Sequence, residues 1–169
     1  MRRLLAAALF VLASSSAALA DGWTTFTDAT GVVSLDVPQQ PTYSSEKTTG
    51  ANGQVIDNAK YLIDGDTVAM LLMIGDFSGR NIDPENALNM AVQGTQSEGR
   101  TLVSDNAVTV DGHTGRDIKL TDQSGDSLRD VLFFFNDHLY QVITVTTPGA
   151  TQDQAAEAQR YSASLHFLH

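Results

Sequence analysis

The four histidines of this 169-residue chain, His113, His138, His166 and His169, are the first candidates for catalysis or metal binding. His113 lies four residues before Asp117, and Ser124 follows in the next loop, which together are the residue types of a hydrolase triad. Residues four apart in a strand are separated by about 13 Å, and no Gly-x-Ser-x-Gly turn is present. The sequence therefore indicates no catalytic set, and a small-molecule hydrolase that uses His113 with a nearby acid is the alternative.

Metal binding depends on two features of the sequence. His166 and His169 have a spacing of three and could ligate zinc or copper with a carboxylate, but fraying at the C-terminus favours a solvated tail. Residues 122–126 contain acidic groups in a loop, yet they lack the alternating ligands and the distal glutamate of a calcium site. We expect no metal site and no cofactor, and a weak metal-binding protein is a further alternative.

A small basic group is the remaining candidate site. If Ile118 pairs with Leu128 on neighbouring strands, Asp117 lies opposite Arg129 and Arg116 lies near them. This arrangement favours an ordinary cross-strand salt bridge. The alternative is a small anion-binding site beside His113. The candidate binding patch therefore consists of four residues: His113, Arg116, Asp117 and Arg129.

Strands must position these residues, and residues 127–146 are expected to form the two central ones. Every side chain from residue 131 to residue 135 is apolar, which is typical of a strand covered on both faces. Asn136-Asp137 predicts a tight turn, because both residue types tolerate left-handed backbone angles. The sequence thus predicts a central hairpin between two helical layers.

Other strands and two helices are indicated around this hairpin. Alternating apolar and polar residues predict hairpins within residues 23–37 and 54–74, with a polar connector at 38–53. Asp83 and Pro84 predict the start of a helix that ends near Gly99, and the capping-box spacing of Thr151 and Gln154 predicts a second helix. Short strands are expected at 101–104, 107–110 and 114–120.

The first 20 residues have the three parts of a secretory signal peptide. Arg2 and Arg3 precede an apolar run at residues 4–12, and Ala18-Leu19-Ala20 precedes Asp21. Cleavage is expected after Ala20, which predicts a periplasmic or secreted protein. The apolar run is shorter than the roughly 20 residues that span a bilayer, and no later segment qualifies, so we expect no membrane insertion.

The rest of the chain, residues 21–169, has a length typical of one domain. It contains no cysteine, so packing rather than disulfide bonds must stabilise it. The formal net charge is −10, and removal of the leader would also remove two arginines. Such a surface repels nucleic acid, which is therefore excluded as a partner. Solubility explains the acidity, and a cationic partner is the alternative.

Five short motifs occur in a characteristic order along nearly the whole of this region: Trp23-x-x-Phe26, Gly31-x-x-Ser34-Leu35-x-Val37-Pro38-x-x-Pro41, Asp111-Gly112-x-x-Gly115, Leu139-Tyr140-Gln141-Val142 and Ser164-Leu165-x-Phe167. In this order the chain resembles the PsbP-like superfamily, which includes the extrinsic photosystem II protein and many small secreted bacterial proteins. The resemblance implies an α+β fold in which helices pack on both faces of an antiparallel sheet, an α/β/α sandwich. It also implies binding or assembly roles rather than catalysis.

No ion-binding or partner-binding residue of the photosynthetic member maps onto this chain, so a photosynthetic function is not expected. The sequence as a whole predicts an exported, non-catalytic binding or assembly-accessory domain of the bacterial periplasm. Its partner would be another protein of the cell envelope.

Overall fold

The structure is a computed structural model that describes residues 22–49, 55–97 and 99–168. The predicted signal peptide and its cleavage site after Ala20 lie outside the described residues, as does His169. No helix in the described part of the chain is both long enough and apolar enough to cross a bilayer.

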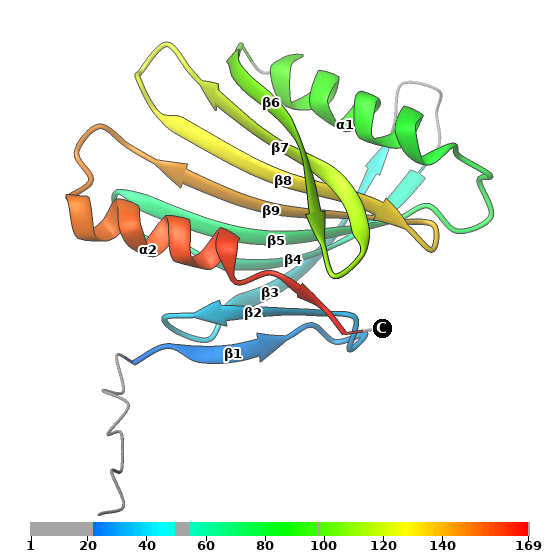
Figure 1. Ribbon diagram of the computed structural model, residues 1–169, viewed down its shortest axis with the longest axis horizontal. Coiled ribbons are helices and arrows are strands. Elements are labelled where there is room, and N and C mark those ends of the chain that lie inside the picture. Colours follow the sequence, from blue (N-terminus) through cyan, green and yellow to red (C-terminus); the bar gives the residue numbers. More distant parts are fainter. Residues whose placement is uncertain (1–21, 50–54, 98, 169) are drawn as a thin grey trace, which may run out of the picture.

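Seven antiparallel strands form the larger of two sheets, in the order β3-β4-β5-β9-β8-β7-β6 (Figure 1). They are β3 (Thr42–Thr49), β4 (Val55–Ile63), β5 (Val68–Asp76), β6 (Thr101–Val110), β7 (His113–Thr121), β8 (Ser127–Phe135) and β9 (His138–Thr146). Asn136 and Asp137 join β8 to β9 with φ angles of 51° and 60°, which is the type I′ geometry of a two-residue turn. The central hairpin lies where the sequence predicted it.

Strand β3 was not predicted, because its segment was assigned to the polar connector. All eight of its residues are exposed, so no alternation of burial marks it in the sequence. It pairs along its whole length with β4, and Lys47 and Lys60 form ion pairs across the two strands with Asp57 and Glu46. The segment becomes an edge strand because β4 offers a free row of backbone hydrogen-bonding groups.

The smaller sheet has the order β1-β2-β10 and consists of β1 (Thr24–Thr27), β2 (Val33–Val37) and β10 (His166–Phe167). Two helices complete the fold, α1 (Pro84–Ser97) and α2 (Gln152–Ala163). Thr151 and Gln154 form the predicted capping box at the start of α2. At the start of α1, the Asp83 carboxylate accepts a hydrogen bond from the backbone N–H of Asn86.

The two faces of the large sheet are named here by neighbouring residues of β8. Leu128, Asp130, Leu132 and Phe134 lie on the Leu132 face, whereas Arg129, Val131 and Phe133 lie on the Phe133 face, because alternate side chains point to opposite sides. On the Leu132 face, α1 packs against β7 and β8. On the Phe133 face, the core includes residues of the small sheet and of α2, which packs against β9, β5 and β2.

The predicted α+β fold with an antiparallel sheet is confirmed, but the two helical layers of the expected α/β/α sandwich are not present among the described residues. The protein is mostly antiparallel sheet with two helices, and a second sheet forms part of the layer where a helical layer was expected. Val33, Leu35 and Val37 of β2 are almost fully buried in the core on the Phe133 face. A short apolar strand can cover a sheet face as well as a helix can, and the sequence pattern does not distinguish the two.

Candidate functional site

The four residues of the predicted binding patch do not form one site. Ile118 pairs with Asp130, and Asp117 pairs with Val131, so the register differs by two residues from the expected pairing of Ile118 with Leu128. Arg116 pairs with Leu132 on the opposite side of β7 from Asp117. The strand thus separates Arg116 from the rest of the patch.

Arg116 is held within the Leu132 face. Its guanidinium group donates hydrogen bonds to both carboxylate oxygens of Asp105 and to the side-chain carbonyl of Asn89 on α1. These contacts link β6, β7 and α1. Arg116 therefore has a structural role and is not directed toward the other three predicted residues.

Asp117 and Arg129 form the salt bridge that the sequence predicted, as diagonal rather than directly opposite neighbours. Arg129 Nε and Nη2 donate to the two oxygens of Asp117 at 2.9 and 2.8 Å, and Nη1 donates to Ser162 Oγ of α2 at 2.7 Å. The hydrogen bonds with Asp117 raise the pKa of Arg129. This bidentate pair joins β7 and β8 to α2 and fixes the direction of the guanidinium group.

His113 belongs to an aromatic cluster instead of an anion site. Its ring stacks on Phe135 with a centroid distance of 3.9 Å and meets the edge of Phe167 at 5.1 Å. Asp117 lies four residues along the same strand, and its carboxylate is occupied by Arg129. Among the described residues, Asp117 therefore makes no direct contact with His113 that would pair them as acid and base.

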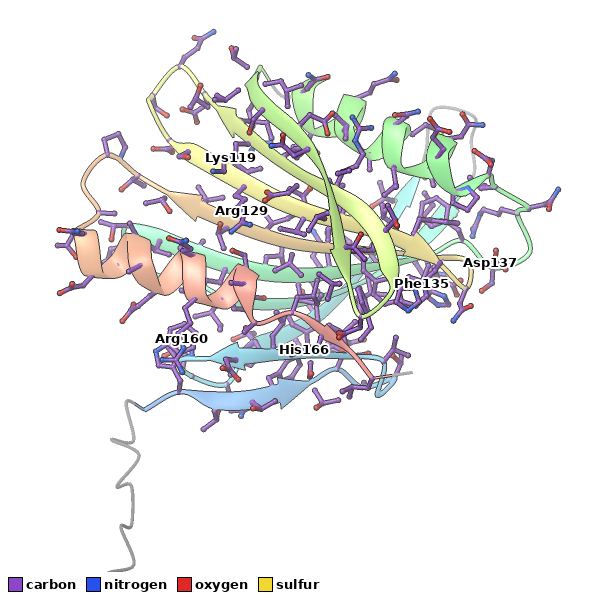
Figure 2. All side chains as sticks on the ribbon, in the orientation of Figure 1. Lys119, Arg129, Phe135, Asp137, Arg160 and His166 are labelled. Carbon is purple, nitrogen blue, oxygen red and sulfur yellow. The ribbon has the colours of Figure 1, made fainter. Side chains whose placement is uncertain are left out.

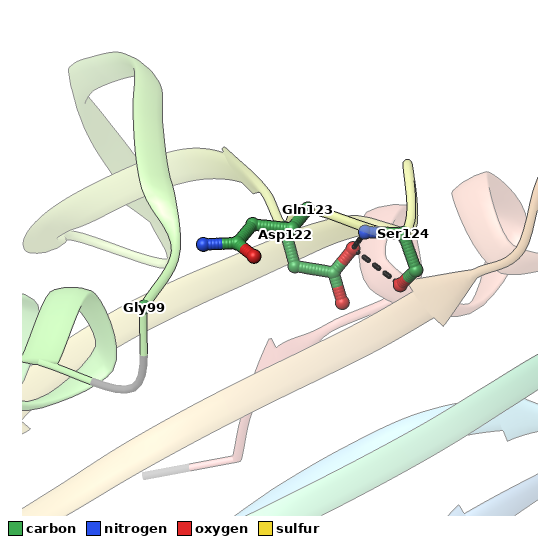
Figure 3. Close-up of a pocket in the computed structure, with 4 residues that line it drawn as sticks. All are labelled: Gly99, Asp122, Gln123 and Ser124. Carbon is green, nitrogen blue, oxygen red and sulfur yellow. Dashed lines mark hydrogen bonds between the residues drawn. The ribbon is translucent and has the colours of Figure 1, made fainter.

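Ser124 lies in a surface pocket lined by Gly99, Asp122 and Gln123 (Figure 3). Its hydroxyl donates to the Asp122 carboxylate at 2.6 Å, and the same oxygen accepts the backbone N–H groups of Ser124 and Asp126. The hydroxyl contact is the main cause of a lowered pKa at Asp122. These bonds close a polar turn between β7 and β8, and no histidine lines the pocket.

No group of three or more histidine, cysteine, aspartate or glutamate side chains gathers as a metal site among residues 22–49, 55–97 and 99–168. His166 Nδ1 lies 3.2 Å from Asp111 Oδ2, which also accepts the backbone N–H of Phe167. This contact connects the β6–β7 turn to β10. The expected pair of His166 and His169 extends beyond the described residues.

A groove between α2 and the large sheet was not predicted. Its volume is about 310 Å³, and it lies on the Phe133 face, where strands β7, β8 and β9 contribute polar side chains. We call it the α2 groove, and its polar wall consists of Lys119, Ser127, Arg129, Thr144 and Thr146. These residues are far apart in sequence, and only the strand register, which pairs Lys119 with Arg129 and Arg129 with Thr144, brings them together.

An open apolar patch was not predicted either. On the Leu132 face, four apolar residues of β4 and β5 lie outside the three buried core clusters, and we call them the open patch: Leu62, Ala69, Leu71 and Met73. Leu62 pairs with Leu71, and Leu71 with Ile143, so one apolar row continues from the core into the patch. The sequence does contain a signal for it, because the all-apolar run in β5 requires cover on both faces.

Comparison with known proteins places these features in a known fold. No protein-family model matches the chain, and no curated protein matches it. The solved structure of cyanobacterial PsbP (CyanoP) from Synechocystis sp. PCC 6803 aligns with 92% of this chain and 98% of its own, at a TM-score of 0.51 and 13% identity. A Pseudomonas aeruginosa protein of unknown function, PA94, aligns with 80% of this chain and 94% of its own, at a TM-score of 0.43 and 15% identity.

The alignment with the cyanobacterial protein covers nearly all of both chains, and identity at this level is informative about the fold alone. It agrees with the order of the five motifs, which lie at turns and core positions of the two sheets. The chain therefore has a PsbP-like fold.

Proposed function

We propose that this protein is a non-catalytic accessory domain, exported to the cell envelope, that binds a protein partner through the open patch. The observation that carries the proposal is the incomplete cover of the Leu132 face. Helix α1 packs mainly against β8 and β7, whereas Leu62 remains 37% exposed on β4. Clustered apolar side chains at a surface are typical of interaction sites.

The partner surface that fits the open patch is one amphipathic helix. Strands β9, β5 and β4 are adjacent, and strands about 4.8 Å apart make three of them about 10 Å wide, which equals the diameter of a helix. Such a helix would lie beside α1 on the same face. It would contribute apolar residues to Leu71 and Met73.

The negative charge of this protein indicates which charged residues the partner helix carries. The chain has a formal net charge of −10, and Asp64 and Asp66 occupy the turn between β4 and β5, next to Leu62 at one end of the open patch. A partner helix with basic residues beside its apolar face would be attracted to this end. A second copy of this acidic chain would be repelled, which makes it the less favoured occupant.

The proposal is tested by capture from envelope extract, followed by reconstitution with the captured protein in purified form. The variant Leu62→Glu/Leu71→Glu should lose binding, because two carboxylates would be buried against apolar residues. Val103→Glu is the matched control, since Val103 is 62% exposed on β6 at the far edge of the sheet. Circular dichroism of the partner segment should show helix formation in the complex.

Retention of binding by the double variant would contradict the proposal. So would a complex that consists of two copies of this chain, detected as a doubled mass by light scattering. Export is tested separately: the chain expressed with its own leader should be recovered from the envelope fraction with Asp21 as its first residue, as measured by intact mass.

A further inference from the structure

We infer that the α2 groove binds a small phosphate-bearing anion. The groove is on the opposite face of the large sheet from the open patch, so this site is independent of the proposed partner surface. It combines two cations, three hydroxyl groups and a volume of about 310 Å³, which lies at the lower end of the range for small-molecule sites.

The first support is the placement of positive charge. Lys119 lies directly opposite Arg129 on the neighbouring strand (Figure 2), and like charges in this position destabilise a sheet. The Asp117 carboxylate compensates Arg129 at 2.8 Å, whereas Lys119 forms no salt bridge in the described part of the chain. A bound anion would supply the missing negative charge in a protein that is otherwise acidic.

The second support is a hydroxyl on the groove wall that has no partner within the described part of the protein. Thr144 is only 5% exposed and lines the groove, yet its side chain makes no hydrogen bond to any residue that the structure describes. Ser127 and Thr146 stand on the same side of the sheet in the next row, where they pair with each other. These hydroxyl groups can therefore donate hydrogen bonds to an oxygen-rich ligand in the groove.

The number of donors favours phosphate over a carboxylate. Arg129 uses three of its N–H groups for Asp117 and Ser162, which leaves two of its five donors, and Lys119 adds three more. The hydroxyls of Ser127, Thr144 and Thr146 can each donate one hydrogen bond as well. A phosphate group has three non-bridging oxygens that accept several hydrogen bonds each, whereas a carboxylate has two oxygens.

Helix α2 leaves space for the rest of the ligand. Ala155 and Ala158 are its small residues that line the groove, and Gln159 adds an amide group at the border. The Arg129 side chain also lines the groove and donates a hydrogen bond to Ser162 of the same helix. An ester group about the size of glycerol could therefore accompany the phosphate.

The test is a titration of the mature chain, followed by amide chemical shifts in NMR spectra. Inorganic phosphate and glycerol 3-phosphate should shift the amides of Lys119, Arg129 and Thr144 saturably, and the affinity should fall as salt is added. Glycerol and malate serve as the neutral and the carboxylate probes. Binding of the ester but not of free phosphate would identify an organic phosphate as the ligand class, whereas equal binding would identify the phosphate group alone.

Three variants make the test specific. Lys119→Ala should weaken phosphate binding by about tenfold or more, and Thr144→Val, which keeps the shape of the side chain, by roughly threefold to tenfold. Lys47→Ala is the matched control, because Lys47 is paired with Asp57 on the edge strand β3 and belongs neither to the α2 groove nor to the open patch. Its affinity should equal that of the wild type, and all three variants should retain the capture of the protein partner.

Three results would overturn the inference: no saturable shift at these amides up to high millimolar phosphate, unchanged affinity in Lys119→Ala, or tighter binding of malate than of both phosphates. None of these results bears on the open patch. Failure of this inference is therefore distinguishable from failure of the proposed function.

Discussion

At the scale of the residue, Asp130 is the group whose surroundings conflict most with its charge. It is fully buried, Gln141 Nε2 donates to its Oδ2 at 2.7 Å, and its Oδ1 has no partner among the described residues. Burial raises the pKa of Asp130 to about 7. The folded state therefore holds a proton on this carboxyl that the unfolded chain, with a pKa near 3.8, releases earlier as the pH rises.

This difference predicts a pH dependence of stability with a definite sign. The contribution of Asp130 to the free energy of unfolding should fall as the pH rises from about 4 to about 7, because the unfolded state binds fewer protons in that range. Asp130→Asn should remove this fall and increase the free energy of unfolding at pH 8 by about 1 to 4 kcal/mol. Urea unfolding of the wild type and the variant at several pH values measures this difference in the free energy of unfolding.

The exposed Asp64→Asn serves as the control and should keep the pH profile of the wild type. An Asp130→Asn protein that is less stable than the wild type at pH 8 would show that the ionised carboxylate is favourable in its site. That outcome would contradict the account of Asp130 as an uncompensated buried acid.

At the scale of the element, two turns of the large sheet allow a test of how backbone angles affect stability. Asn136-Asp137 and Asp111-Gly112 both join antiparallel strands through residues with positive φ, at 51° and 60° in the first turn and 46° and 85° in the second. Glycine adopts such angles without a steric penalty, whereas aspartate does not. The second turn has the favoured residue at its second position, and the first turn lacks it.

We therefore expect Asp137→Gly to stabilise the protein by a few tenths to about 1 kcal/mol, because it relieves strain in the central hairpin. Gly112→Ala, at the equivalent position of the other turn, should destabilise it by about 1 kcal/mol. Urea unfolding of both variants measures these shifts. Shifts of the same sign would show that the backbone angles of these turns do not control their stability.

The same elements show which parts of the fold the sequence predicts and which it does not. The central hairpin was predicted because an apolar run and a turn are local signals. Strand β3 was missed because none of its side chains is buried, and two short strands were predicted where β6 is one strand with an irregularity between Leu102 and Ser104. Strand β3 and the continuous β6 both form because they pair with a neighbouring strand, and such pairing leaves no local pattern in the sequence.

Register explains the outcome for the candidate site as well. The salt bridge of Asp117 with Arg129 was predicted from residue types. Arg116 is separated from it because successive side chains of a strand point to opposite faces, and a register that differs by two residues brings Lys119 opposite Arg129. The length of the β7–β8 turn sets this register, and the sequence does not show where the strands end. The α2 groove therefore becomes visible only in three dimensions.

At the scale of the whole molecule, the small sheet and the large sheet share one core. Phe167 of β10 contacts the rings of Phe133, Phe135 and Tyr140 with centroid distances of 5.0, 4.8 and 5.6 Å. The Asp111 carboxylate also accepts the backbone N–H of Phe167 at 2.9 Å. The contacts of this residue join β10 to β8, to β9 and to the β6–β7 turn.

This shared core predicts that the two sheets unfold together as a single domain. Trp23, the only tryptophan, packs against the core next to β1 and lies 4.4 Å below the guanidinium group of Arg160, so its fluorescence reports on the small sheet. Circular dichroism reports mainly on the large sheet. The two transitions in urea should coincide, and Phe167→Ala should shift both together by about 3–5 kcal/mol. If the fluorescence transition came first, or if Phe167→Ala moved it alone, the small sheet would be an independent unit attached to the large one.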